Sequence, residues 1–241
     1  MSVVVRFAPS PTGYLHIGGA RTAIFNYFFA RHHNGKFYLR IEDTDRERST
    51  KEFENEIIES MKWLGMEYDG ELVYQSQRMD IYKKYIEKLL ATGNAYHCNC
   101  SVQELEVERE RAMKEKRKPL YSKKCRDSGL KEGVVRFRVP EEGEAVINDL
   151  VLGKIVIQYK EVEDFVIARA DGFPTYNFTV VVDDAEMGMT HVIRGDDHVN
   201  NTHLYFIYWA AGAIHCHGNI KLPFVDNAYH FKQSFCPALA G

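Results

Sequence analysis

A loop rich in proline and glycine separates the first strand-like run of the sequence from the first helical one. It reads Pro9-Ser10-Pro11-Thr12-Gly13-Tyr14-Leu15-His16-Ile17-Gly18-Gly19. The prolines stiffen the loop, and the paired glycines, which lack β-carbons, allow the backbone to approach a nucleotide closely at a helix N-terminus. His16 is placed to donate a hydrogen bond to a phosphate oxygen. The spacing matches neither the dinucleotide-binding fingerprint nor the P-loop, so it predicts a phosphate site of another kind.

Three cysteines form a second group of residues whose types and spacing could do chemistry. Cys98 and Cys100 are separated by one residue, and Cys125 follows further along the chain. Thiolates are soft ligands, and three of them in a reducing compartment favour Zn²⁺ with a fourth oxygen or nitrogen ligand. Buried cysteines without a metal are the alternative interpretation.

A basic segment, residues 109–126, holds nine lysines and arginines against two glutamates. The whole chain carries a formal charge of −3 at pH 7, so no global positive field attracts a polyanion. The segment is therefore interpreted either as a solvated helix face or as a local contact with the phosphate backbone of a nucleic acid. The second interpretation rests on Lys116, Arg117 and Lys118.

Strand and helix patterns alternate along the chain. Alternating and β-branched runs predict strands over residues 3–7, 36–42, 134–139, 155–159, 165–168, 178–182 and 191–194. Apolar residues at helical spacing predict helices that begin near residue 19, near residue 49 and before residue 81, the last of them ending at Gly93. Such alternation is typical of a parallel α/β sheet, whose ligands bind beyond the carboxyl ends of the strands.

Composition indicates the broad class of the protein. Its 241 residues are 45% hydrophobic, which is enough to bury a core, so disorder is excluded as the main state. The longest apolar stretch, residues 204–214, has 11 residues and is too short to cross a bilayer, so we expect no membrane partner. No export signal is recognised, which predicts a cytoplasmic location where the five cysteines form no disulfides.

The motifs taken together resemble one family. Residues 6–13 and 15–21 look like the first signature of the class I aminoacyl-tRNA synthetases, in the form used by glutamyl-tRNA synthetases. Further matches follow in the same order at Ile41-Glu42-Asp43-Thr44-Asp45, Pro174-Thr175-Tyr176-Asn177-Phe178, Val181-Val182-Asp183-Asp184 and Val192-Ile193-Arg194-Gly195-Asp196-Asp197-His198. The resemblance extends from Val3 to about Thr202.

This resemblance implies a Rossmann-like domain that activates L-glutamate with ATP and Mg²⁺ and transfers the glutamyl group to the 3′ end of tRNA(Glu). It implies His16, Gly18 and Gly19 as catalytic residues. It implies an ATP site made of Pro9, Thr12, His16, Gly18 and Asp197. It implies a glutamate site made of Arg6, Ala8, Ser10, Glu42, Tyr176 and Arg194. Two guanidinium groups suit an amino acid with two carboxylates, because bidentate contacts between arginine and carboxylate are strong.

The resemblance also implies an inserted α+β domain, residues 96–170, that carries one structural Zn²⁺ and approaches the acceptor end of the tRNA. Many family members take the fourth zinc ligand two residues after the last cysteine, where this chain has Asp127. Tyr121 resembles instead the fourth ligand of the glutamyl-queuosine relatives, and the choice between the two stays open. Residues 1–95 and 171–202 then form the two halves of the catalytic domain, and we expect a monomer.

After Thr202 the resemblance stops. Family members continue to a Lys-x-Ser-Lys loop that clamps pyrophosphate, whereas the lysines beyond residue 200 are Lys221 and Lys232, and neither begins such a loop. Residues 203–241 are therefore expected to be a divergent or truncated tail. Two alternatives to an active ligase follow: a catalytically impaired fragment that binds ATP, glutamate or tRNA, and an enzyme like glutamyl-queuosine tRNA(Asp) synthetase.

Overall fold

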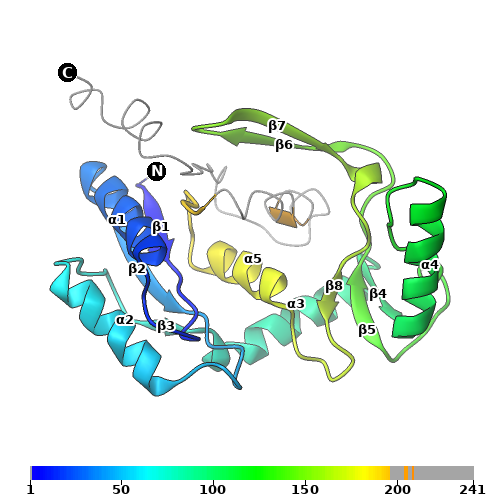
Figure 1. Cartoon of the computed structure of the whole chain (residues 1–241), viewed down its shortest axis with the longest axis horizontal. Coiled ribbons are helices and arrows are strands. Elements are labelled where there is room, and N and C mark those ends of the chain that lie inside the picture. The colour runs from blue at the N-terminus through cyan, green and yellow to red at the C-terminus, as the bar shows by residue number, and fades with distance from the viewer. Residues whose placement is uncertain (1, 196–203, 206–207, 209–241) are drawn as a thin grey trace.

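Two groups of elements flank a central helix in the computed structural model, which describes residues 2–195, 204, 205 and 208 (Figure 1). The first group contains a parallel sheet with the strand order β1 (Val4–Phe7), β2 (Lys36–Ile41) and β3 (Val73–Tyr74). Val4 lies opposite Lys36, and Arg40 lies opposite Val73. The predicted parallel α/β sheet is thereby confirmed. Because the strands are parallel, the loops that follow β1 and β2 leave the same edge of the sheet.

Helices α1 (Ile17–His32) and α2 (Lys51–Trp63) belong to this group (Figure 1). Their apolar faces pack on the sheet in one cluster that includes Phe37, Leu39, Ile57 and Met61. The sequence predicts the start of α2 near residue 49, and the N-cap in the structure is Thr50. Its hydroxyl accepts the hydrogen bond from the Phe53 N–H at 3.2 Å. A 3₁₀ turn (Gln75–Gln77) and helix α3 (Met79–Ala91) lead to the second group.

The second group is antiparallel. Its sheet has the order β4 (Ala95–Cys98), β5 (Val134–Phe137) and β8 (Val166–Ala168), and helix α4 (Val102–Lys114) lies beside it (Figure 1). A long hairpin of β6 (Glu144–Asp149) and β7 (Gly153–Gln158) extends away from this sheet (Figure 1). A 3₁₀ turn (Tyr159–Glu161) follows β7 and leads back to β8. Strands predicted over residues 134–139, 155–159 and 165–168 are therefore present with bounds that differ by a few residues.

The strand predicted over residues 178–182 is wrong. These residues form the middle of helix α5 (Tyr176–Glu186), which lies between the two groups (Figure 1). Every residue of α5 from Phe178 to Ala185 is buried, so the helix shows no polar face and its apolar run looks like that of a buried strand. The strand predicted over residues 191–194 is also absent, because His191 and Arg194 are single bridge residues there.

The largest apolar cluster joins α3 and α5 to the second group. It includes Leu89 from α3, Phe137 from β5 and Phe178 from α5, together with Tyr205 and Tyr208. The described residues of the expected tail, residues 204, 205 and 208, are thus packed in the core, and the rest of residues 203–241 lies outside the part that the structure describes. No helix in the described ranges has the length and apolar character that a membrane crossing requires.

Candidate active site

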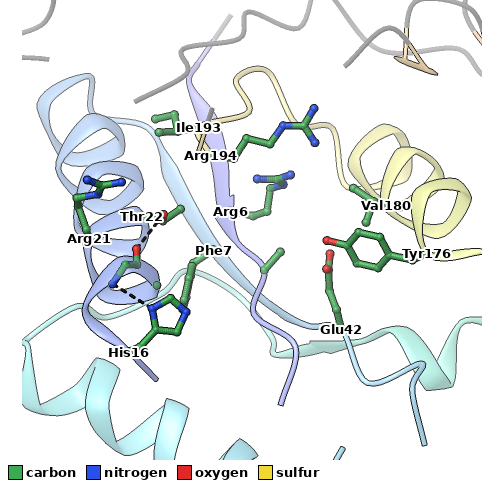
Figure 2. A pocket seen from close by; sticks show the side chains of 14 residues that line it. Arg6, Phe7, His16, Arg21, Thr22, Glu42, Tyr176, Val180, Ile193 and Arg194 are labelled. Carbon is green, nitrogen blue, oxygen red and sulfur yellow. Dashed lines mark hydrogen bonds between the residues drawn. The ribbon is translucent and has the colours of Figure 1, made fainter. Parts of the chain in front are cut away.

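A cavity of about 390 Å³ opens where β1 and β2 end, between the start of α1 and the start of α5 (Figure 2). It is lined by Arg6, Phe7, Ala8, His16, Gly18, Gly19, Arg21, Thr22, Glu42, Tyr176, Val180, Ile193, Arg194 and Gly195. Eight of the residues singled out from the sequence are among them: Arg6, Ala8, His16, Gly18, Gly19, Glu42, Tyr176 and Arg194. Segments far apart in the sequence thus meet at the carboxyl edge of the parallel sheet, as such sheets require.

Other residues singled out from the sequence do not line this cavity. The Pro9 carbonyl accepts a hydrogen bond from the Glu42 N–H at 2.9 Å, and the Ser10 carbonyl accepts one from the Thr12 N–H at 2.9 Å. These contacts fold the loop back on itself and tie it to the end of β2. Asp197 lies outside the described residues.

His16 is the N-cap of α1. Its ring nitrogen Nδ1 accepts a hydrogen bond from the Gly18 N–H at 3.2 Å, and the imidazole lies beside the cavity (Figure 2). A neutral imidazole that accepts at one nitrogen carries its proton on the other, so Nε2 is the donor that the ring offers to a ligand.

The two glycines that follow His16 lie close to neighbouring side chains. A β-carbon on Gly19 would lie 2.8 Å from Cδ1 of Leu15, and one on Gly18 would lie 3.0 Å from the His16 ring. Their small size therefore lets the histidine cap the helix tightly. It also keeps the first turn of α1 open toward the cavity, and this turn contains no acidic residue that would repel an anion.

Arg6 reaches the cavity from β1 and is held by Asp184 of α5. Its Nε donates to Oδ1 of Asp184 at 2.9 Å and its Nη2 donates to Oδ2 at 3.1 Å. Burial opposes the charge on both groups, but each ion raises the stability of the other: the pKa of Arg6 is raised, and Arg6 and Arg40 hold the pKa of Asp184 at about 2. Nη1 is the nitrogen of Arg6 that this pair leaves for other contacts.

Arg40 lies fully buried on β2 behind the cavity. Its Nη1 donates to Oδ1 of Asp184 at 2.7 Å, and its Nη2 donates to Oε1 of Glu42 at 3.0 Å. Burial raises the pKa of Glu42, and Arg40 and Arg6 oppose that shift. One buried guanidinium thus connects the carboxylate that orients Arg6 with the carboxylate that faces the cavity.

Tyr176 and Arg194 are two further polar residues that line the cavity. Tyr176 is the first residue of α5, and its hydroxyl points toward the Glu42 carboxylate, which raises the pKa of the phenol (Figure 2). Arg194 enters from the segment after α5, and burial lowers the pKa of its guanidinium. The cavity is therefore lined by one carboxylate, that of Glu42, and by three guanidinium groups, those of Arg6, Arg194 and, from α1, Arg21.

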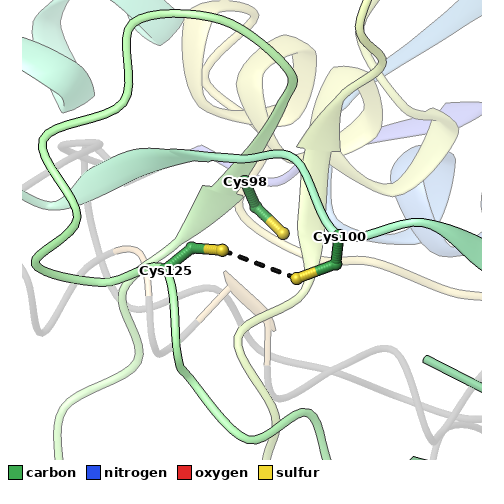
Figure 3. A group of neighbouring side chains, drawn as sticks. All are labelled: Cys98, Cys100 and Cys125. Carbon is green, nitrogen blue, oxygen red and sulfur yellow. Dashed lines mark hydrogen bonds between the residues drawn. The ribbon is translucent and has the colours of Figure 1, made fainter. Parts of the chain in front are cut away.

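Three thiols meet in the second group of elements. The sulfur atoms of Cys98, Cys100 and Cys125 all lie within 4.8 Å of one another, and those of Cys100 and Cys125 are 3.5 Å apart (Figure 3). The Tyr121 hydroxyl lies 3.4 Å from the sulfur of Cys98 and 3.6 Å from that of Cys100. Although burial opposes ionisation, the hydrogen bond from Tyr121 helps to lower the pKa of Cys98 to about 7. Three thiols and one phenol thus surround a common centre.

The structure does not bring Asp127 to these thiols. Its side chain is 87% exposed and accepts a hydrogen bond from Nη2 of Arg138 at 3.1 Å. Of the two residues considered as a fourth ligand, Tyr121 is therefore the one that faces the sulfur atoms.

The three basic residues proposed to contact phosphates are exposed and follow α4. Arg117 is paired with Glu115 through two hydrogen bonds of 2.8 and 2.6 Å. Lys118 donates to the Glu161 carbonyl at 2.8 Å, whereas Lys116 adopts a positive φ of 54° at the turn after the helix. Two of the three side chains are thus already engaged within the protein, Arg117 by a carboxylate and Lys118 by a backbone carbonyl.

Comparison with known proteins shows which family this chain belongs to. The model for the catalytic domain of the class I tRNA synthetases (E and Q) matches residues 2–234. The chain belongs to this family.

Relatives of this class I synthetase domain include glutamate–tRNA ligases. The one from Thermodesulfovibrio yellowstonii is 59% identical over 212 residues, which are 84% of this chain and 45% of the relative. The one from Oleidesulfovibrio alaskensis is 58% identical over 203 residues, 83% of this chain and 44% of the relative. A crystal structure of a glutamate tRNA ligase from Elizabethkingia meningosepticum in complex with its amino acid shares 32% identity and a TM-score of 0.81, over 98% of this chain and 53% of that one. The chain thus spans about half the length of these relatives or less.

The sequence did not predict a site role for two buried residues of this synthetase domain, Arg40 and Asp184. Asp184 belongs to the Val181–Asp184 motif that carried the resemblance, yet no role was assigned to it. Arg40 is a charged residue inside a strand whose neighbours Leu39 and Ile41 are fully buried. A charge at such a position is rare without a partner, and this was the signal that could have found the pair.

Proposed function

We propose that this chain is the catalytic part of a glutamate–tRNA ligase. It activates L-glutamate with ATP to glutamyl-adenylate and transfers the glutamyl group to the 3′ end of tRNA(Glu). The observation that carries this proposal is the cavity in which Arg6, Arg194 and Glu42 meet beside the start of α1. The names of the relatives, which are glutamate–tRNA ligases, support it.

The charges of the cavity match those of glutamate. Arg6 and Arg194 supply guanidinium groups for the two carboxylates, and Glu42 with Tyr176 faces the ammonium group. Because Asp184 occupies two nitrogens of Arg6, the contact of Arg6 with substrate is made through Nη1. Ala8 leaves room beside Arg6, and Ser10 acts from the adjoining loop outside the cavity lining.

The phosphates of ATP belong at the start of α1. Nε2 of His16 and the backbone N–H of Gly19 in the first turn provide donors for phosphate oxygens, whereas the Gly18 N–H is held by Nδ1 of His16. Pro9, Thr12 and Asp197 complete this site in the proposal. The reaction is an in-line attack of the glutamate carboxylate on the α-phosphorus, so these residues position the reactants and stabilise developing charge. Mg²⁺ enters with ATP as part of the substrate.

The second group of elements is proposed as the inserted domain that approaches the tRNA acceptor end. Three thiols within 4.8 Å of one another, with the Tyr121 hydroxyl beside two of them, fit the donor set of a structural Zn²⁺ site. Cys98, Cys100, Cys125 and Tyr121 would hold this ion. The ion would thereby tie the segment before α4 to the segment after it. Lys116, Arg117 and Lys118 are proposed to contact the tRNA backbone.

The deciding experiment is glutamate-dependent exchange of pyrophosphate into ATP, with tRNA(Glu) present. We expect exchange with glutamate and none with glutamine. Calorimetry with glutamate and with ATP on the same sample separates binding from turnover. Binding without exchange identifies the catalytically impaired fragment, whereas modification of tRNA(Asp) instead of charging of tRNA(Glu) identifies the glutamyl-queuosine type of enzyme.

A further inference from the structure

Tyr205 lies beyond the motifs read from the sequence, although the family model extends over it, and it reaches the back of the cavity. Its hydroxyl donates a hydrogen bond of 2.7 Å to Oδ2 of Asp184. The same oxygen accepts the bond from Nη2 of Arg6 at 3.1 Å. The side chain is 2% exposed, so this contact is formed away from solvent.

The ring of Tyr205 makes a second contact. The guanidinium carbon of Arg194 lies over this ring, 5.7 Å from its centroid, at a separation where a cation and an aromatic face attract each other. Two of the arginines that line the cavity are therefore linked to one side chain, Arg6 through Asp184 and Arg194 directly.

Asp184 is fully coordinated only when Tyr205 is in place. Its Oδ1 accepts from Nε of Arg6 at 2.9 Å and from Nη1 of Arg40 at 2.7 Å. Its Oδ2 accepts from Arg6 and from Tyr205. Without the phenol, Oδ2 keeps one of these two donors, and the three donors that remain on the carboxylate all belong to arginines. Any shift of the Asp184 carboxylate that the lost hydrogen bond permits would move the paired Arg6 guanidinium with it.

We propose that Tyr205 is a positioning residue that sets the orientation of both guanidinium groups for the carboxylates of the amino-acid substrate. The inference rests on the proposed function, since it assigns both arginines to glutamate. It makes Tyr205 a supporting part of the amino-acid site. Tyr205 does not line the cavity, and it acts through Asp184 and Arg194.

Tyr208 provides a matched control. It is fully buried in the same cluster as Tyr205, but in the described part of the chain its hydroxyl has no hydrogen-bond partner. Its ring packs edge-on against Phe137, with the centroids 4.7 Å apart, and against Phe178 at 5.9 Å. Removing the hydroxyl of Tyr208 therefore removes no contact to either arginine.

The test compares Tyr205→Phe and Tyr208→Phe in the full chain. Calorimetry measures the affinities for glutamate and for ATP, and a thermal melt measures the stability. We expect Tyr205→Phe to weaken glutamate binding by about 3- to 10-fold, with ATP binding within about 2-fold of the unaltered protein, since one hydrogen bond to a charged group is lost. Tyr208→Phe should leave both affinities unchanged. Tyr205→Leu, which also removes the ring from Arg194, should weaken glutamate binding further than Tyr205→Phe.

Two results would overturn the inference. One is unchanged glutamate affinity in Tyr205→Phe while the unaltered protein binds glutamate, which leaves the proposed function intact. The other is an equal loss of glutamate and ATP affinity in Tyr205→Phe, which indicates a general structural role. If the unaltered protein binds no glutamate, the proposed function fails first and the inference with it.

Discussion

The carboxylate of Asp184 holds the guanidinium of Arg6 through two hydrogen bonds, 2.9 and 3.1 Å long, between side chains that are both buried. A pair with two bonds fixes the rotation of the guanidinium plane as well as its position. The cavity therefore contains an arginine whose direction is set before any ligand arrives. Such preorganisation reduces the ordering cost of binding.

Replacing Arg6 with Lys should separate charge from geometry. An ammonium group keeps the positive charge but cannot make two parallel bonds to Asp184 and also face the cavity. We expect Arg6→Lys to weaken glutamate binding by about 100-fold while ATP binding changes little, as measured by calorimetry. Arg31→Lys is the matched control, because Arg31 pairs with Asp69 on the surface at 2.8 Å, away from the cavity. Equal loss of both ligands in Arg6→Lys would contradict a role in glutamate recognition.

Replacing Asp184 with Asn should produce a loss of stability that depends on pH. The variant leaves two buried arginines without their common anion, which typically costs about 3–5 kcal/mol. Arg6 and Arg40 hold the folded-state pKa of Asp184 at about 2, below its ordinary value of 3.8, so its stabilising effect is present above pH 3.8 and is lost as the pH falls toward 2. The difference between the variant and the unaltered protein should thus be largest at pH 7 and should shrink below pH 4.

Urea unfolding at several pH values between 7 and 2.5 measures this difference. Asp69→Asn serves as the comparison, since its partner Arg31 is partly exposed and the pair should contribute about 1 kcal/mol or less. A difference for Asp184→Asn that stays constant down to pH 2.5 would show that the charge of Asp184 is not what stabilises the fold.

Local patterns in the sequence predicted the elements around His16. The order of strand, loop and helix there follows from a β-branched run, prolines, glycines and a helical period. Glu42, Tyr176 and Arg194 were instead implied by the family resemblance, and the structure places all three at the cavity.

The pairs that could not be predicted join distant parts of the chain. Arg6 and Asp184 are 178 residues apart and Arg40 and Asp184 are 144 apart, so no local pattern reports either contact. The wrong prediction of a strand within helix α5 has the same cause, which is that distant contacts are not visible in the local sequence. Its apolar run is buried on all sides, and only its packing between the two groups of elements decides that it coils instead of extending. Tertiary burial overrode the β-branched preference of Val180, Val181 and Val182.

Replacing His16 with Asn tests whether the histidine does more than cap a helix. Asn is a good N-cap, and its side-chain oxygen can replace Nδ1 as the acceptor for the Gly18 N–H, but it lacks the donor that Nε2 provides. We expect the rate of pyrophosphate exchange to fall by about 100- to 1,000-fold, with the thermal midpoint and the ligand affinities near those of the unaltered protein. His16→Ala, which removes cap and donor together, should also lower the thermal midpoint. A rate within about 3-fold in His16→Asn would leave the histidine only a capping role.

The fourth ligand of the cysteine cluster can be decided by two substitutions that remove one group each. Tyr121→Phe removes the hydroxyl that lies 3.4 Å from the sulfur of Cys98, whereas Asp127→Asn removes a charge that is exposed and paired with Arg138. We expect protein purified without chelator to contain about one zinc per chain by elemental analysis, because three thiolates with an oxygen donor complete a tetrahedral site. Tyr121→Phe should lower the zinc affinity by about 10- to 100-fold, and Asp127→Asn should not change it.

The controls for this prediction come from the other cysteines. The double change of Cys98 and Cys100 to Ser should abolish zinc binding, whereas Cys216→Ser, at a cysteine far from these three in the sequence, should leave it intact. Loss of zinc in Asp127→Asn but not in Tyr121→Phe would require the segment after Cys125 to turn its carboxylate inward, away from Arg138. Zinc-free protein with all three thiols reactive would instead mean that the cluster is a buried group of cysteines held together by the Tyr121 hydroxyl, since that hydroxyl already bridges Cys98 and Cys100.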